Sequence, residues 1–282
     1  MKIATGVLIW ISCLMTTQAG EWEYLLDEDL TKFEIWMGVP HSSVTGLPDG
    51  TPQSKQAGQG IGVPMGLDND VKNVFSTIIE NGEVVLYITG EIYGGLTTLE
   101  NYSNYHLSVQ FKWGDKKWPP RLNLLRDSGI IYHSYGKQRR FWQVWKSGLE
   151  YQVQETDMGD FISIAGPKVQ IRVNWNQKRA RYDKTSDEYA STYTSAYPEP
   201  DKPHGEWNSL EIYAVGNTAV HVVNGEVVMV VEEATKANGT PLTEGQIQIQ
   251  SEAAECYYKD FKIRAIDAFP PEIRAEMRLK GE

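Results

Sequence analysis

Apolar and polar residues alternate along most of this chain with the period of two that is typical of β-strands. The alternation is clearest in six runs that we predict to be strands: 84–89, 106–113, 169–175, 210–215, 219–223 and 246–250. Between two of them, the pair Asn224 and Gly225 predicts a hairpin with a type I′ turn. Many short strands without a βαβ rhythm predict an all-β fold, a jelly-roll sandwich of two antiparallel sheets with long loops.

Helical patterning is scarce. Residues 27–33 could form a turn or two, and the tail from Pro271 to Met277 could be a short helix with a proline early, where proline is tolerated. Two long segments, 41–67 and 179–205, fit no strand, and both are rich in Ser and Pro. Long loops on a β scaffold often carry function.

The first residues have the pattern of a cleaved export signal. Lys2 precedes an apolar run over 3–15, and Ala19 ends a group of small residues that suits a signal peptidase. The run is shorter than the roughly 20 residues that a spanning helix needs. We therefore expect a periplasmic or secreted protein whose mature chain begins near Gly20. Lipoprotein processing at Cys13 is the less favoured alternative, because the residues before it fit a lipobox poorly.

The remaining chain suits one domain over residues 20–266 with a tail over 267–282, because no linker or repeat divides it. Removing residues 1–19 deletes one lysine and no acid, so the net charge moves from −10 to −11. An acidic surface argues against nucleic acid and anionic lipid as partners, and no other run is long and apolar enough to span a membrane. Cys256 is then the only cysteine, which excludes an intrachain disulfide and predicts a buried thiol.

The strand-like run E-Y-Q-V-Q places Glu150, Gln152 and Gln154 on one face of a sheet. A row of hydrogen-bonding groups close to tryptophans suits a polyhydroxylated ligand such as a sugar. The alternative is that these residues form the wet face of an antiparallel sheet. Alternation alone does not decide between a binding surface and a wet face.

Seven motifs carry a resemblance to a known family. They are L-L-D-E-D-L-T-K-F-E-I-W, G-E-I-Y-G-G-L-T-T, F-K-W-G-D-K-K-W, R-D-S-G-I-I-Y-H, E-Y-Q-V-Q-E-T-D-M-G-D, G-E-W-N-S-L-E-I-Y and I-Q-S-E-A-A-E-C-Y-Y-K-D-F. In this order, over nearly the whole mature chain, they resemble the 3-keto-disaccharide hydrolase domain family of concanavalin-like jelly rolls. The chain departs from that family at Thr156, where the family often has glycine.

The resemblance implies an exported enzyme that cleaves glycosides already oxidised to a ketone at C3. Such a ketone acidifies the C2 proton, so a base could remove that proton and the C1 substituent could leave by elimination, with water adding afterwards. This chemistry needs a base near C2, a hydrogen-bond donor or cation at the ketone oxygen, and a proton donor for the leaving group. Two alternatives stay open. One is ordinary two-carboxylate hydrolysis, with Glu150 paired to Asp157 or Glu91. The other is a non-catalytic carbohydrate-binding module of the same fold.

Within this chemistry, His133 is the predicted base or proton shuttle because its pKa is ordinarily near neutral. Glu150 is the predicted general acid, general base or metal ligand. The alternative is that it is only a solvated carboxylate on a strand. The other candidates fall into three groups: a further catalytic acid, Asp157; substrate-binding residues Lys112, Arg126, Trp142, Gln152 and Gln154; and a loop that could bind a divalent metal ion through Glu155, Asp157 and Asp160. His133 could equally be a surface or core histidine, and loop acids are often only solvated.

Overall fold

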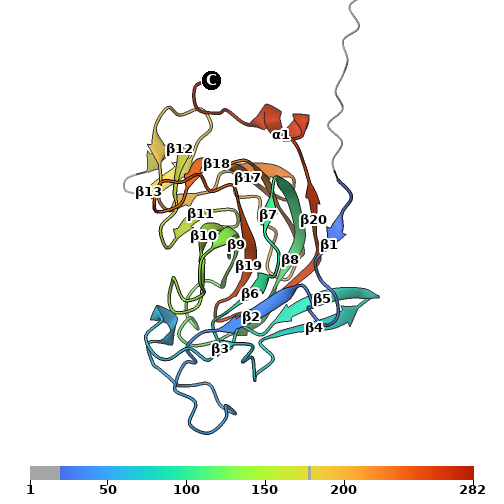
Figure 1. The fold of residues 1–282 in the computed structure, drawn as a ribbon, viewed down its shortest axis with the longest axis vertical. Coiled ribbons are helices and arrows are strands. Elements are labelled where there is room, and N and C mark those ends of the chain that lie inside the picture. Colours follow the sequence, from blue (N-terminus) through green and yellow to red (C-terminus); the bar gives the residue numbers. More distant parts are fainter. Residues whose placement is uncertain (1–19, 177–178) are drawn as a thin grey trace, which may run out of the picture.

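The computed structural model describes residues 20–176 and 179–282 and folds them into two packed β-sheets (Figure 1). The predicted signal, residues 1–19, lies outside the described residues, and export stays a prediction. No helix in the described part of the chain is long and apolar enough to cross a membrane. The predicted fold class, an all-β sandwich of antiparallel sheets, is confirmed.

The first sheet, which we call the back sheet, has the spatial order β4–β5–β20–β8–β16–β17–β18, with β1 beside β20. Its strands are β1 (Glu23–Tyr24), β4 (Phe75–Glu80), β5 (Glu83–Ile88), β8 (Tyr105–Lys117), β16 (Asn208–Val215), β17 (Thr218–Val223), β18 (Glu226–Thr235) and β20 (Ala254–Ala265).

The second sheet, the front sheet, has the order β3–β2–β6–β19–β9–β10–β11 and continues through β15 and β13 to β12, which also pairs with β18. The two-residue strands β7 and β14 lie beside β19 and β12. The strands are β2 (Phe33–Met37), β3 (Gly66–Leu67), β6 (Gly94–Thr98), β7 (Tyr102–Ser103), β9 (Asp127–Tyr135), β10 (Ser147–Gln154), β11 (Phe161–Ile164), β12 (Lys168–Asn176), β13 (Arg179–Tyr182), β14 (Tyr189–Ala190), β15 (Thr194–Ser195) and β19 (Glu244–Ser251).

The hydrophobic core lies between the two sheets and is built by the alternation that the sequence shows. Leu149, Tyr151 and Val153 of β10 are buried there, at most 1% exposed. From the back sheet, alternate residues of β8 such as Val109 and Phe111 are buried in the same core. Cys256 is also fully buried, as predicted. Because one face of β10 is taken by the core, its other residues must lie on the opposite face of the front sheet.

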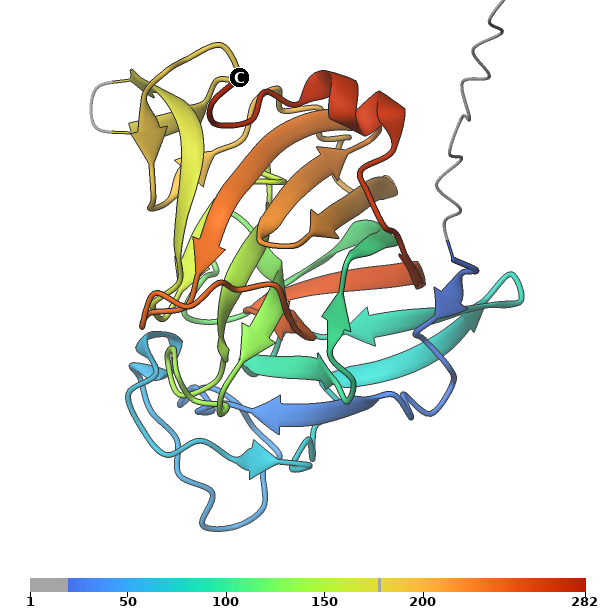
Figure 2. The same cartoon turned by 45° about the horizontal axis from the view of Figure 1, so that its top comes forward.

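The predicted strands and hairpin turn are present at their expected places. The β17–β18 turn has φ of +49° at Asn224 and +86° at Gly225, the two positive values that a type I′ turn requires. A six-residue helix, α1 (Pro271–Glu276), follows the last strand and lies at one end of the sheets (Figure 2).

Three expectations for the irregular segments need correction. Residues 27–33 form turns and the start of β2 instead of a helix, because the Asp27 carboxylate accepts hydrogen bonds from the N–H groups of Asp29 and Thr31. Segment 179–205 contains β13, β14 and β15. These strands are too short for the alternation of apolar and polar residues to reveal them. Segment 41–67 includes the 3-10 turn Ala57–Gln59 and ends in β3.

Candidate functional site

The face of the front sheet that points away from the core carries a row of polar side chains. In β10, Glu150 pairs with Ile131, Gln152 with Gly129 and Gln154 with Asp127 of the neighbouring strand β9. Paired residues of an antiparallel ladder share a face. We call this surface the polar face; alternate residues of β19 extend it on the other side of β9: Gln246, Gln248 and Gln250, with Glu252 just beyond the strand.

Three carboxyl groups gather near one end of the polar face, around a single guanidinium. Arg121, from the loop after β8, reaches Asp127 Oδ2 at 2.5 Å and Glu252 Oε1 at 3.1 Å. Asp127 and Glu252 also face each other across a β-bridge. Glu150 is the third carboxyl and has no cation within ion-pair distance among the described residues. We call Asp127, Glu150, Glu252 and Arg121 the carboxyl cluster; it holds more acids than its one cation can neutralise.

The glutamines of β10 fix the Asp127 carboxylate. Gln152 Nε2 donates to Asp127 Oδ1 at 2.7 Å, and Gln154 Nε2 donates to Oδ2 at 2.9 Å. Together with Arg121, these donors satisfy both oxygens of Asp127 and favour its ionised form. The carbonyl oxygen of the Gln152 side chain is buried without a hydrogen-bond partner among the described residues, so the polar face holds one unsatisfied acceptor.

Glu150 lies in a space that a glycine leaves open. A Cβ at Gly129 would collide with the Glu150 carboxyl and would lie 2.7 Å from Gln250 Oε1. Any side chain at position 129 would therefore displace Glu150. Glu150 is only 3% exposed, which makes its environment poorly solvated.

Burial raises the pKa values of all three acids in the carboxyl cluster. The pKa of Glu150 lies well above its ordinary range because the group is buried, and the neighbouring Asp127 charge raises it further while Gln250 opposes the shift. Burial also raises the pKa of Glu252, with Asp127 adding and Arg121 opposing. Burial raises the pKa of Asp127 to about 6, against the lowering effects of Arg121, Gln154 and Gln152. A proton can therefore be held on Glu150 at a pH where Asp127 is ionised.

An aromatic cluster stands on the same side of the front sheet. Tyr93 stacks on Trp145 with ring centroids 5.9 Å apart, and Phe141 stacks on Trp142 at 4.8 Å. Three residues separate Trp142 from Trp145, which would place them on opposite faces of a regular strand, but 141–145 is a tight loop with positive φ at Trp142 and Gln143. Their rings are 5.7 Å apart. Trp142 is half-buried and thus keeps some surface for a ligand.

His133 is not part of the carboxyl cluster. The pairing of β10 with β9 skips from Tyr132 to Tyr135, and His133 sits in the resulting bulge with φ of +46°. The extra residue breaks the alternation, so the ring turns into the core against Tyr105 and Tyr132, with centroids 5.5 and 5.6 Å away. His133, the predicted base or proton shuttle, therefore does not share a pocket with Glu150, and burial lowers its pKa to about 4.

A His133→Asn variant should turn over substrate at the wild-type rate, and its free energy of unfolding should fall less at acid pH than that of the wild type. Asn tolerates the positive φ. Since the folded pKa of His133 is depressed, its contribution to stability is present above pH 6.5 and is lost as the pH falls toward 4. Between pH 7 and 4, unfolding in urea should show the wild type losing about 3 kcal/mol more than the variant. A folded variant that is at least 100-fold slower at pH 7 would instead support a catalytic histidine.

Lys112 and Arg126 also lie apart from the carboxyl cluster. Lys112 belongs to β8 of the back sheet, and its Nζ lies 4.7 Å from the ring centroid of Trp207 on that sheet's outer side. Arg126 precedes Asp127, but its guanidinium pairs with Glu155 at 2.7 Å and donates to the Asp115 carbonyl oxygen at 3.0 Å. Each cation therefore has a local role in packing or pairing.

The acidic loop after β10 is organised by Arg179 and Arg126. Arg179 Nη2 lies 3.5 Å from both Asp157 and Asp160, and Asp160 also accepts from the Tyr193 hydroxyl at 2.6 Å. Burial raises the pKa of Asp160 to about 7. The predicted metal ligands therefore contact cations, and within residues 20–176 and 179–282 no three His, Cys, Asp or Glu side chains are grouped as a metal site. Glu91, the other proposed acid, pairs with Lys72 at 3.5 Å.

A cavity of about 780 Å³ opens where the polar face meets this loop. Gln154 contributes to its wall and also contacts Asp127, so the cavity adjoins the carboxyl cluster. Trp175 and Tyr193, both more than a third exposed, supply aromatic surface in it. We call it the outer cavity; its mixture of aromatic rings and hydrogen-bonding groups suits a sugar or another cyclic group.

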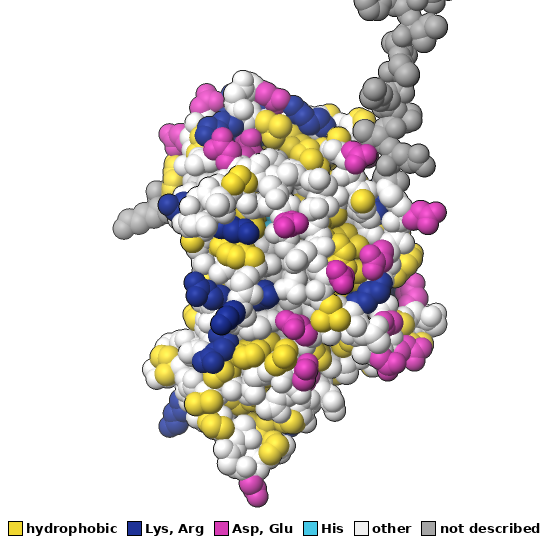
Figure 3. Space-filling view, viewed as in Figure 1, with side chains coloured by type: hydrophobic (Ala, Val, Ile, Leu, Met, Phe, Trp, Pro, Cys, Tyr) yellow, Lys and Arg dark blue, Asp and Glu magenta, His cyan; other side chains and the backbone are white. Residues whose placement is uncertain are grey.

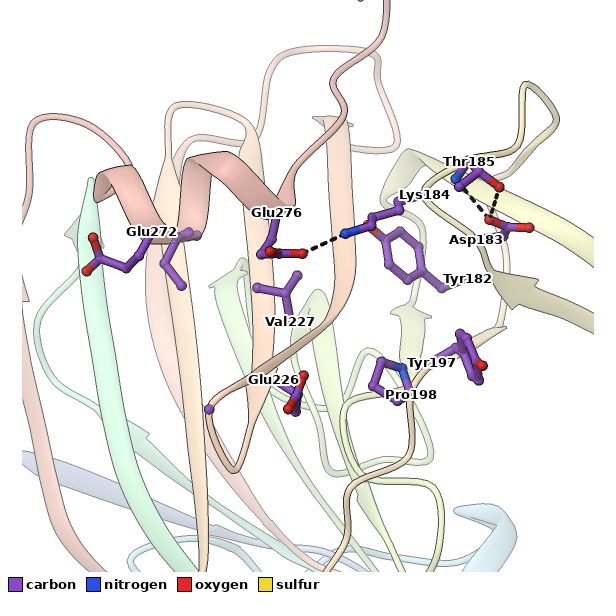
Figure 4. Close-up of a pocket in the computed structure, with 12 residues that line it drawn as sticks. Tyr182, Asp183, Lys184, Thr185, Tyr197, Pro198, Glu226, Val227, Glu272 and Glu276 are labelled. Atoms are coloured by element: carbon purple, nitrogen blue, oxygen red, sulfur yellow. Dashed lines mark hydrogen bonds and ion pairs between the residues drawn. The ribbon is translucent and has the colours of Figure 1, made fainter.

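A second cavity of about 460 Å³ lies under α1, between β13 and the β17–β18 turn (Figure 4). Its wall includes the ion pair of Lys184 with Glu276 at 2.6 Å, and Asp183 bonded to Thr185. It includes no residue of the polar face, and its acids pair locally or face solvent. The carboxyl cluster with the outer cavity is therefore the better candidate site.

Sequence reasoning missed Arg121, Asp127, Glu252 and Gln250. For three of them a signal existed: Asp127 stands in the quoted motif R-D-S-G, and alternation from Gln246 onward leads to Gln250 and Glu252 on one face. Arg121 has no such signal, because it comes from a loop whose path only the fold defines. The strand residues Glu150, Gln152 and Gln154 are brought together on one face.

Comparison with known proteins gives three findings. The family model described as the 3-keto-alpha-glucoside-1,2-lyase-like domain matches residues 21–264. A 3-keto-disaccharide hydrolase of Bacteroides thetaiotaomicron is 34% identical over 102 residues, which are 31% of this chain and 35% of that protein, so the match spans about a third of that relative's length. Solved structures with a similar fold include alginate lyase AlyC3, with a TM-score of 0.45 at 10% identity over 83% of this chain and 89% of that chain. Another is the carbohydrate-binding module CBM66 from Bacillus subtilis, with a TM-score of 0.41 at 10% identity over 68% and 92%.

Proposed function

The chain belongs to the 3-keto-alpha-glucoside-1,2-lyase-like family, and from this membership we propose that it cleaves the glycosidic bond of 3-keto-glycosides with Glu150 as the proton-transfer group. The observation that carries the proposal is the carboxyl cluster, in which a buried carboxyl without a cation lies beside an ionised one. Elevated pKa values of this kind are typical of groups that transfer protons near neutral pH.

The reaction proceeds through the C2 position of the sugar. Ionised Glu150 takes the C2 proton, and the electrons of that C–H bond form an enolate on the C3 oxygen. The enolate then restores the ketone, a C1–C2 double bond forms, and the C1–O bond breaks. The leaving oxygen takes a proton from Glu150, after which water adds its hydroxyl to C1 and a proton to C2. Atoms and electrons balance without an oxidant or reductant.

The other residues of the polar face have supporting roles in this proposal. Arg121 contacts two of the acids, and the Gln250 Nε2 group has no hydrogen-bond partner among the described residues, so these two donors are suited to the oxygen that becomes an enolate. The free Gln152 carbonyl oxygen accepts from a sugar hydroxyl. The outer cavity receives the leaving group, because Gln154 links it to Asp127.

Solvent deuterium tests the mechanism. In D2O, elimination followed by addition of water returns a deuteron to C2, so the released 3-keto sugar should carry deuterium there by mass spectrometry or NMR. Incubating the product without enzyme measures background exchange beside the ketone. Release of a sugar that carries no more deuterium than this control would favour ordinary hydrolysis by two carboxylates.

The pH dependence should identify Glu150 as the base. Its ionised form acts first, so kcat/KM should rise with pH through a midpoint well above the ordinary Glu pKa, because burial and the Asp127 charge raise that pKa. Replacing Asp127 by Asn removes one of these causes, so the midpoint should move to lower pH. An unchanged midpoint in a folded Asp127→Asn variant would assign the pH dependence to another group.

A further inference from the structure

A group of lysines and arginines lies at the end of the polar face opposite the outer cavity. The loop between β9 and β10 and the loop before β19 enclose a cavity of about 590 Å³, which Lys236 joins to a neighbouring cavity of about 310 Å³. We call the two cavities together the basic pocket; its cations are Lys137, Arg139, Arg140, Lys146 and Lys236. Figure 3 shows Lys and Arg gathered on this side of the molecule, whereas Asp and Glu gather mostly on the other.

These cations lack the partners that most cations of an acidic protein have. Across residues 20–176 and 179–282, none of the five has a carboxylate within 4.0 Å. Arg139 donates to the neutral Gln143 amide at 2.9 and 3.0 Å, and Lys236 lies 5.2 Å from the Tyr135 ring centroid. Five unpaired cations around two cavities, in a chain of net charge −10, point to an external anion.

Lys146 gives independent support because it is buried. It is 7% exposed, and its Nζ donates to the neutral Gln246 Oε1 at 2.5 Å. Burial lowers the pKa of Lys146, and Glu34 on β2 opposes the shift. Glu244, at the rim, is exposed. A buried ammonium without a carboxylate in contact is costly, and an incoming anion would remove that cost.

The basic pocket is continuous with the polar face. Lys146 donates its backbone N–H to Gln248 Oε1 at 3.0 Å, and Gln248 Nε2 donates to Gln138 Oε1 at 2.9 Å. Gln246, Gln248 and Gln250 follow one another along β19 toward the carboxyl cluster. At about 3.3 Å per residue, the four steps from Gln246 to Gln250 cover roughly 13 Å, a distance that a short oligosaccharide can span.

We propose that the basic pocket binds a carboxylate or sulfate group carried by a carbohydrate chain whose other end reaches Glu150. Arg139 and Arg140 supply the planar donors that carboxylate and sulfate oxygens accept in pairs. The inference rests on the proposed function for the identity of the ligand, and it adds that the natural substrate is an acidic glycan.

Binding, measured without turnover, tests this proposal separately from catalysis. Calorimetry on the mature chain at low salt would compare a tetragalacturonate and a sulfated tetrasaccharide with a neutral tetrasaccharide and with inorganic sulfate. We expect at least one acidic oligosaccharide to bind about 10-fold or more tighter than the neutral one, and its affinity to fall with added salt. If acidic oligosaccharides bind more tightly but no 3-keto-glycoside is cleaved, the result contradicts the proposed activity and leaves the proposed anion site standing.

Variants of the exposed arginines locate the effect. The double variant Arg139→Gln with Arg140→Gln should abolish the acid preference and leave neutral binding unchanged, while the matched surface variant Arg181→Gln should retain the preference. Equal affinity for acidic and neutral oligosaccharides, no binding of either, or a preference that survives the double variant would overturn the proposal. So would inorganic sulfate binding as tightly as the acidic oligosaccharides, because the site would then recognise a free ion.

Discussion

Turnover of a 3-keto-glycoside by the Glu150→Gln variant should be slower than that of the wild type by about 100-fold or more, the scale of lost general acid–base help. Glutamine has the same size and fits the space that Gly129 leaves, so the polar face should keep its shape. The amide cannot accept the C2 proton or protonate the leaving oxygen. Steady-state release of the leaving group gives kcat, and substrate binding should change little.

A glutamate-to-glutamine change on the other sheet controls for the loss of one negative charge, as distinct from the loss of proton transfer. Glu83 is exposed and pairs with Lys259 on the back sheet, so Glu83→Gln should leave turnover within a few-fold of the wild type. If Glu150→Gln folds and turns over at the wild-type rate, Glu150 is not the proton-transfer group. Asp127 and Glu252, the other acids of the carboxyl cluster, would then be the next candidates.

Arg121→Gln should have the largest effect on stability. The change removes the cation that contacts Asp127 and Glu252, each about 5% exposed, and breaking a buried pair in this way costs about 3–5 kcal/mol. The free energy of unfolding from urea titrations at pH 7 measures the loss. Because Arg121 lowers the pKa of Asp127, its loss raises that pKa above about 6, so the stability loss should shrink as the pH falls toward 6 and level off below it.

Arg181→Gln is the control for this second prediction. Arg181 and Glu199 are both more than 40% exposed and 3.9 Å apart, so losing their pair should cost about 1 kcal/mol or less. If Arg121→Gln were no more destabilising than this control at pH 7, the carboxyl cluster would not depend on Arg121 for its charge balance.

The fold was predictable because alternation reports directly on which face of a strand is buried. The rule worked for β10, where Tyr151 and Val153 face the core and Gln152 and Gln154 do not. It failed at His133, where a single extra residue in β9 reverses the facing of a side chain. Sequence alternation cannot reveal such a bulge, because the bulge is defined by the partner strand.

The candidate site was predictable only where strands build it. Glu150 could be placed from its own strand, but the charged groups around its neighbour Asp127 include Arg121 from a distant loop and Glu252 from just beyond another strand. A family resemblance orders motifs along the chain without giving distances between them. For this reason Lys112, which stands within the motif F-K-W-G-D-K-K-W, was expected near the site although it belongs to the outer side of the back sheet.

The central claim is that the chain acts on a sugar ketone. The most direct measurement compares leaving-group release from one glycoside and from its 3-keto form, under the same conditions. The proposed mechanism predicts release from the 3-keto form and very little from the unoxidised glycoside, since without the ketone the C2 proton is too weakly acidic for Glu150. Equal rates on both would contradict it in favour of ordinary hydrolysis, and binding of both without release from either would contradict it in favour of a carbohydrate-binding module.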